Sequence, residues 1–249
     1  MLLLPDVTLF AIDVVKPLMT IEAMAFSCQW VRFAEVVLLT DTNIHPQLKD
    51  YAMNFDEVVK VHIRTIHTVQ SNKKVPCPRK EHYHLPIDYE MSSMRDPILH
   101  MQTSHILYME WDSAVLNPLA WNPDWLHYDY VGAPWPPFHE PGWTDCDGHT
   151  NNVGNGGFSL RSKNYCKWTR IMTDQFKNDP GVISSDKFPC LTKRPWLEEN
   201  GVIFAPDYEA MAFSCENRIF CGQFGYHGNG TVVRNGWGGS FFDKRKYIK

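Results

Sequence analysis

Long apolar runs, paired cysteines and a dominant charge are all missing from this sequence, and each absence narrows what the protein can be. Its seven cysteines include no C-x-x-C pair, so their spacing predicts neither a zinc knuckle nor a redox dithiol. The three leucines after Met1 end at Pro5 and Asp6, which is too short for a signal sequence, and no other stretch is long enough to span a membrane. We therefore expect a reduced, cytoplasmic protein with no transmembrane segment.

The charge balance excludes a further class of partners. The chain has 24 Lys and Arg against 28 Asp and Glu, a net charge of −4 at pH 7, so we expect no nucleic-acid partner. Aromatic residues are plentiful, at 13% of the 249 residues. Most of them are expected in the core, and others could line a sugar or nucleotide site, because flat rings suit the faces of sugars and bases. Composition alone does not decide between these roles.

The first half of the chain alternates strands with helices. Apolar runs predict buried strands over residues 7–12, 36–39 and 58–63, and helical patterns lie between them from Pro17 to Phe26 and over 46–52. This order is typical of a parallel sheet with helices on both faces, so we predict an α/β fold.

The second half is rich in loops. Gly and Pro are frequent between residues 132 and 157, as expected for loops that build a site on a rigid scaffold. The remaining pattern predicts a polar loop over 71–87, a helix over 89–101 interrupted at Pro97, a strand over 106–109, helices over 163–176 and 194–200, a short strand over 202–204 and a Gly-rich tail from 228.

Two carboxylates stand at the end of the strand predicted over 106–109, in the segment Glu110-Trp111-Asp112. In a strand, residues i and i+2 point to the same side, so Glu110 and Asp112 are expected to face one direction. Ligands bind outside the carboxyl ends of strands in open α/β sheets, and hard oxygen ligands there suit Mg²⁺ or Mn²⁺ held together with substrate phosphates. On the bare pattern, two exposed acids at a strand end remain the commoner alternative.

The segment NVGNGGFSLRS, residues 152–162, has a chemical rationale of its own. Its glycines at 154, 156 and 157 let the backbone approach a substrate closely, and Asn155 offers a donor and an acceptor to sugar hydroxyls. Phe158 to Arg161 alternate as a strand does. No Gly-Lys-Ser/Thr follows, so the segment is not a phosphate-binding P-loop.

These segments and four others resemble, in order and spacing, a family of GT-A-like glycosyltransferases catalogued mostly as a domain of unknown function. The resemblance runs from Ile106 to Gly228, and VGNGGFSLRS is its most specific part. The segments are EWDSAVLNPLAW (110–121), DYVGAPW (129–135), VGNGGFSLRS (153–162), SDKFPC (185–190), RPWLEENGVIFAP (194–206) and FGYHG (224–228).

The resemblance implies one GT-A-like, Rossmann-like domain with a mostly parallel sheet. Residues 1–112 would form its nucleotide-binding half, 113–228 its acceptor and catalytic half, and 229–249 a C-terminal tail. The implied activity is a metal-dependent, inverting transfer of a hexosyl or pentosyl group. The donor would be a nucleotide-diphosphate sugar, and the acceptor a glycan or another carbohydrate.

The resemblance also implies a metal site. Asp112 would bind a divalent cation, Mn²⁺ in the first place with Mg²⁺ as the alternative, and Glu110 would contact this ion through water or contact the donor ribose. Trp111 would belong to the same donor site. His227, which stands where many GT-A enzymes place a C-terminal histidine, would complete the metal site, and a neutral imidazole is a competent Mn²⁺ ligand. A loop histidine bonded locally is the alternative.

The implied base is Asp186, which would take the proton of the acceptor hydroxyl. The family shows Glu-Asp here, whereas this chain has Ser185 before Asp186, so one acid of the usual pair is missing. Capping of the following helix is the alternative role for Asp186. Sugar contacts are expected from Trp135, Asn155, Gly156 and Gly157, with Trp143 as a further stacking candidate, and nucleotide contacts are expected from Asp13, Lys16 and Asp41.

Two other functions fit part of the pattern. A sugar nucleotidyltransferase would share the fold and metal, but it should carry a glycine-rich basic phosphate loop after the first strand, and residues 13–17, DVVKP, provide none. A carbohydrate-binding protein without catalytic activity would fit the loss of the acid at Ser185.

Overall fold

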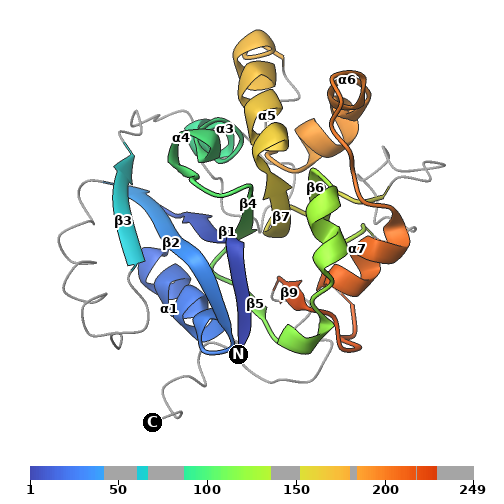
Figure 1. Ribbon diagram of the computed structural model, residues 1–249. Helices are drawn as coiled ribbons and strands as arrows, with labels where there is room; N and C mark the ends of the chain where they lie inside the picture. Colours follow the sequence, from blue (N-terminus) through green and yellow to red (C-terminus); the bar gives the residue numbers. More distant parts are fainter. Residues whose placement is uncertain (42–60, 67–86, 136–151, 180–183, 217, 229–249) are drawn as a thin grey trace.

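The computed structural model describes residues 1–41, 61–66, 87–135, 152–179, 184–216 and 218–228 (Figure 1). Several predicted features lie outside these residues: the helix over 46–52, most of the polar loop over 71–87, Trp143 and the tail beyond 228.

A six-stranded sheet in the order β3-β2-β1-β4-β7-β6 forms the centre of the molecule. The pairs β1–β2, β2–β3 and β1–β4 are parallel, while β7 runs antiparallel to both β4 and β6. The predicted α/β fold with a mostly parallel sheet is therefore confirmed. The strands are β1 (Leu2–Ile12), β2 (Val31–Asp41), β3 (Val61–Ile66), β4 (His105–Met109), β6 (Tyr130–Gly132) and β7 (Phe158–Ser162).

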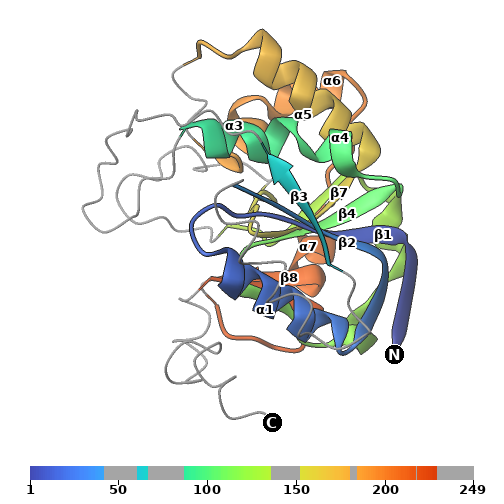
Figure 2. The same cartoon turned by 90° about the vertical axis from the view of Figure 1, so that its left-hand side faces the viewer.

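Helices cover both faces of this sheet, as Figure 2 shows. The helix α1 (Pro17–Cys28) lies on one face, and α3 (Ile87–Arg95), α4 (Pro97–His100) and α5 (Lys163–Gln175) lie on the other. The predicted break at Pro97 is confirmed, because α3 ends at Arg95 and α4 begins at Pro97. The remaining helical segments are α6 (Arg194–Glu199), α7 (Asp207–Phe213), the 3₁₀ turns Pro118–Ala120 and Pro123–His127, and a π-helical turn, Phe188–Thr192.

A second, three-stranded sheet adjoins the carboxyl end of β4. Its strands are β5 (Ser113–Val115), β9 (Gly225–His227) and β8 (Ser214–Glu216), with β9 in the middle. Strand β9 is antiparallel to β5 and parallel to β8, so His227 lies beside Ser113 and Glu216. The strand predicted over 202–204 is reduced to a single bridge between Phe204 and Tyr130.

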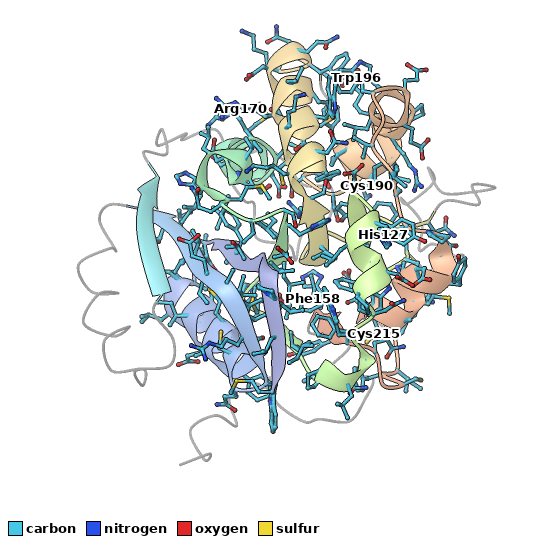
Figure 3. The ribbon with its side chains drawn as sticks, viewed as in Figure 1. His127, Phe158, Arg170, Cys190, Trp196 and Cys215 are labelled. Carbon is cyan, nitrogen blue, oxygen red and sulfur yellow. The ribbon has the colours of Figure 1, made fainter. Side chains whose placement is uncertain are left out.

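Two apolar clusters fill the space between the sheet and its helices. Successive residues of a strand point to opposite faces, so Leu107 belongs to the cluster under α1 whereas Tyr108 belongs to the cluster under α5. Figure 3 labels Phe158 and Cys215 in the first cluster and Cys190 in the second. Among the described residues, no helix has both the length and the apolar character needed to cross a membrane.

Candidate metal and donor site

The acidic pair lies in a turn that joins the two sheets. Strand β4 ends at Met109, and residues 110–112 turn the chain into β5. The N–H of Glu110 donates to the carbonyl of Gly157 at 2.9 Å, and the hydroxyl of Ser113 donates to the carbonyl of Glu110 at 2.9 Å. Strand periodicity is therefore not what aligns the two carboxylates, because β4 ends at Met109 and a turn from Glu110 to Ser113 follows. The turn itself brings them together.

The two carboxylates meet the imidazole of His227. Its Nε2 lies 3.4 Å from Oε2 of Glu110 and 3.4 Å from Oδ1 of Asp112. One ligand atom from each of the three residues lies within 4.8 Å of the others. The structure thus brings together three residues that are up to 117 positions apart in the chain (227 minus 110).

These three residues fit a divalent cation. Atoms spaced this closely can share one ion, since Mg²⁺ binds its ligands at about 2.0–2.1 Å. The two carboxylate oxygens suit both Mn²⁺ and Mg²⁺, and the imidazole nitrogen suits a transition metal such as Mn²⁺ better than Mg²⁺. Oδ1 of Asp112 is buried and receives no hydrogen bond from the described residues. A cation at this position would supply the bond that this buried oxygen lacks.

A fourth residue, Glu216, lies at the other ring nitrogen of His227, Nδ1. Its Oε2 lies 3.2 Å from Nδ1 of His227, because the parallel register of β8 and β9 sets the two residues opposite each other. A carboxylate at Nδ1 orients the ring and keeps Nε2 directed at the metal position, as is common for metal-binding histidines. The sequence carried no signal for Glu216, since its closeness to His227 depends on the pairing of two short strands.

Opposite charges and burial shift the pKa values of the residues in this site. Burial lowers the pKa of His227, but the carboxylates of Glu216 and Asp112 outweigh burial, so the pKa is raised well above its usual value. Burial raises the pKa of Asp112, yet His227 and Lys16 reverse this effect and lower it. The pKa of Glu216 is raised by burial in spite of the opposing effect of His227. The carboxylates of Glu110, Asp112 and Glu216 therefore stabilise a positive charge in this site.

The pair Gly156-Gly157, called the glycine turn below, lies directly against the candidate metal ligand His227 and against Asp186. A Cβ added to Gly157 would stand 2.1 Å from Nε2 of His227, and a Cβ added to Gly156 would stand 3.1 Å from Cβ of Asp186. Gly156 and Gly157 therefore permit a close approach that no other residue allows. Asn155, which is 4% exposed, precedes this pair and uses its carbonyl to accept a hydrogen bond from the hydroxyl of Tyr130.

Asp186 faces the glycine turn from the start of the π-helical turn. One of its oxygens, Oδ1, accepts hydrogen bonds from the hydroxyl of Ser184 and from the N–H of Lys187. No described residue donates to its second oxygen, Oδ2. Asp186 thus stabilises its own turn, as the capping alternative requires, and it also lies beside Gly156 of the glycine turn.

The residues predicted for nucleotide contacts take different positions. Asp13 accepts hydrogen bonds from the N–H groups of Val15 and Lys16, both at 2.7 Å, and from the hydroxyl of Thr20 at 2.5 Å, so it stabilises the turn into α1. The ammonium group of Lys16 lies 3.5 Å from the centroid of the Trp111 ring. Asp41 is the last residue of β2, as predicted, and its side chain lies outside the described part of the structure.

Trp135 does not occupy the position expected of a sugar-stacking residue. Its side chain is 1% exposed, and a Cβ added to Gly154 would stand 2.0 Å from its ring. The ring therefore packs in the core on the α5 side of the sheet, and neither of its faces is open to a sugar. The prediction of sugar stacking by Trp135 was wrong for this reason.

The sheet order and the position of the site define the class of fold, which is that of GT-A-like glycosyltransferases. Mouse xyloside xylosyltransferase 1, in its apo form, is similar over 90% of this chain and 98% of its own, with a TM-score of 0.55 and 12% sequence identity. At this identity the likeness shows the fold alone.

The chain itself belongs to the family described as "Protein of unknown function (DUF5672)", which matches residues 98–227, more than half of its length. No curated protein matches the sequence. Two further structural likenesses are weaker, each with a TM-score of 0.45. One is the glycosyltransferase GlyE of Streptococcus pneumoniae TIGR4, at 12% identity over 82% of this chain and 46% of that one. The other is 4-diphosphocytidyl-2C-methyl-D-erythritol synthase of Anaerococcus prevotii DSM 20548, at 10% identity over 80% of this chain and 86% of that one.

Proposed function

We propose that this protein is a metal-dependent glycosyltransferase that moves a sugar from a nucleotide-diphosphate sugar to a glycan or carbohydrate hydroxyl, with inversion at the anomeric carbon. The convergence of Glu110, Asp112 and His227 beside Gly157 supports this proposal, because it provides a cation site where the fold class holds its donor.

The donor would bind across the turn that carries the acidic pair. Asp112 and His227 would hold the cation, and Glu110 would contact it directly or through water. When bound, the cation neutralises the nucleoside diphosphate as it leaves. Lys16 adds a positive charge at the same edge of the sheet, near Asp112 and against Trp111, where it can approach the diphosphate. In this arrangement residues 1–112 serve the donor and residues 113–228 the acceptor.

The acceptor hydroxyl would lie at Asp186. Transfer with inversion requires a carboxylate that takes the proton of this hydroxyl while the oxygen attacks the anomeric carbon. Asp186 is suitably placed, since it faces the glycine turn that also contacts His227. Gly156 admits Asp186 and Gly157 admits His227, so both side chains lie against neighbouring residues of one turn.

The test is a panel of nucleotide-sugars incubated with the protein and Mn²⁺, with release of nucleoside diphosphate as the readout. We expect release with at least one donor, and its loss in Asp112→Ala. Asp174→Ala is the matched control, because Asp174 lies exposed on α5. An α-configured product from an α-configured donor would contradict inversion.

Two results would contradict the proposal itself. Sugar binding with no dependence on metal or nucleotide would identify a carbohydrate-binding protein. Release of pyrophosphate from a nucleoside triphosphate and a sugar phosphate would identify a nucleotidyltransferase.

A further inference from the structure

A carboxylate from a distant part of the chain lies beside Ser185, the position where the acid before Asp186 is missing. Oε2 of Glu90, on α3, accepts a hydrogen bond from the N–H of Ser185 at 2.7 Å, although the two residues are 95 positions apart. Glu90 is mostly covered by neighbouring residues, and part of its surface stays exposed. No other described residue donates a hydrogen bond to Glu90. Its carboxylate is thus bonded to the residue that directly precedes Asp186, the candidate base.

A buried arginine fixes the helix that carries Glu90 against the glycine turn. The guanidinium of Arg161 donates from Nη1 to the carbonyl of Ser93 on α3 at 3.2 Å, and from Nη2 to the carbonyl of Gly156 at 3.1 Å. Gly156 in turn contacts Asp186. Helix α3, the glycine turn and the turn at Asp186 therefore form a closed set of contacts, and this set holds Glu90 in a defined place.

Burial and two neighbouring carboxylates shift the pKa of Glu90. Burial raises the pKa of Glu90 to about 7, the hydrogen bond from Ser185 acts in the opposite direction, and the negative charges of Asp186 and Glu110 add to the rise. The charges of Asp186 and Glu110 therefore disfavour the ionised form of Glu90. A carboxylate that titrates near neutral pH is well matched to accept and release protons.

We propose that Glu90 is a second catalytic carboxylate of this site and receives the proton of the acceptor hydroxyl in place of Asp186, whose role is then to hold that hydroxyl in position. The inference rests on the proposed function. In the step, the O–H bond of the acceptor breaks and its proton passes to Glu90. The acceptor oxygen forms a bond to the anomeric carbon, and the bond from that carbon to the donor diphosphate breaks, with its electron pair leaving on the diphosphate.

The decisive variant is Glu90→Gln. The amide oxygen of Gln can still accept the N–H of Ser185, so the local structure is kept, but the amide cannot take up a proton. We expect kcat for transfer to fall about 100-fold or more, the usual range for a general base. Binding of Mn²⁺ and of the nucleoside diphosphate product, measured by calorimetry, should stay unchanged. Added formate should restore part of the rate to Glu90→Ala, because it can occupy the space and accept the proton.

The matched control is Glu199→Gln, which removes the charge of an exposed glutamate on α6 and should leave kcat unchanged. If the wild-type protein transfers sugar and Glu90→Gln does so equally fast, Glu90 has a structural role alone and the inference is overturned. If the wild-type protein releases no nucleoside diphosphate from any nucleotide-sugar, the proposed function fails, and the role of Glu90 fails with it.

Discussion

Single side chains of the site are held by opposite charges rather than by apolar packing. His227 illustrates this best, since Glu110, Asp112 and Glu216 all lie within 3.4 Å of its ring nitrogens. The side chains of His227, Asp112 and Glu216 are each less than a fifth exposed. In such surroundings, removal of one partner leaves the others buried without compensation, which is costly.

Glu216→Ala should weaken Mn²⁺ binding without removing any residue that contacts the ion. Loss of the carboxylate at Nδ1 frees the ring of His227 to rotate, and supporting residues of this kind change metal affinity by about 10–100-fold. The measurement is Mn²⁺ titration followed by electron paramagnetic resonance. An unchanged affinity would show that Glu216 does not orient the histidine.

Gly157→Ala should abolish Mn²⁺ binding, because the new methyl group would stand 2.1 Å from Nε2 of His227 and displace the ring. Gly201→Ala is the matched control. Gly201 has a φ of +81° and open space around its Cβ position, so alanine there costs stability of about 1 kcal/mol but touches nothing in the site. The prediction fails if both variants bind Mn²⁺ as the wild type does.

Glu90→Gln should also change the pH dependence of stability. The pKa of Glu90 is raised from 4.5 to about 7 in the folded protein, so between these values the folded state binds the proton that the unfolded state has lost. Stability therefore falls as the pH rises through this window. The thermal midpoint of Glu90→Gln minus that of the wild type should therefore be more positive at pH 8 than at pH 4. Parallel curves for the two proteins would argue against the raised pKa.

At the scale of elements, the segment 152–162 combines two tasks. Its glycines admit His227 and Asp186, and the strand that follows, β7, joins β4 to β6 and carries Arg161 into the core. Arg161 is 2% exposed and lies 3.9 Å from the centroid of the Tyr108 ring, with its hydrogen bonds directed to backbone carbonyls and Ser159. The loop and the strand are therefore one structural unit.

Arg161→Met should destabilise the fold, since it leaves the buried carbonyl of Ser93 without the donor that Arg161 provides, while the carbonyl of Gly156 keeps the hydroxyl of Ser159. We expect a loss of about 1–3 kcal/mol in the free energy of unfolding, the usual cost of one unsatisfied buried group. Chemical denaturation measures this loss. Arg170→Met is the control, because Arg170 is partly exposed and makes a longer bond of 3.4 Å to the carbonyl of Arg95. Equal losses in the two variants would contradict the role given to Arg161.

Sequence patterns within one segment predicted the local structure well, whereas contacts between distant segments could not be predicted from them. The helix break at Pro97 follows from the geometry of proline, and the alternation of β7 follows from the period of a strand. Glu216 and Glu90 carry no local signal, because their partners are brought to them by strand pairing and helix packing. For Trp135, sugar stacking was predicted where the structure shows burial, because that burial depends on the close approach of Gly154.

For the whole molecule, the two sheets meet where the parallel strands end. The turn at 110–112 is the direct link between them, so donor and cation would bind at the seam between the larger and the smaller sheet. A ligand at this position stabilises the fold as a whole, because it contacts residues of both sheets in the folded state alone.

Mn²⁺ together with a nucleoside diphosphate should therefore raise the thermal midpoint. At ligand concentrations 100-fold above the dissociation constant, the gain is about 2.7 kcal/mol, which corresponds to several degrees. A chelator should reverse the shift, and Asp112→Ala should not show it. A shift that survives the chelator would mean that the nucleotide binds without metal.

The central place of β9 in the small sheet has a consequence for synthesis of the protein. Asp112 leaves the ribosome 115 residues before His227 (227 minus 112), and the strand that carries His227 has to insert between β5 and β8. Until then the nascent chain holds Glu110, Asp112 and Glu216 with no imidazole to offset their charge. The cation site can form only when translation has passed Gly228. A fragment that stops before Gly225 therefore keeps most of the large sheet and lacks the cation site.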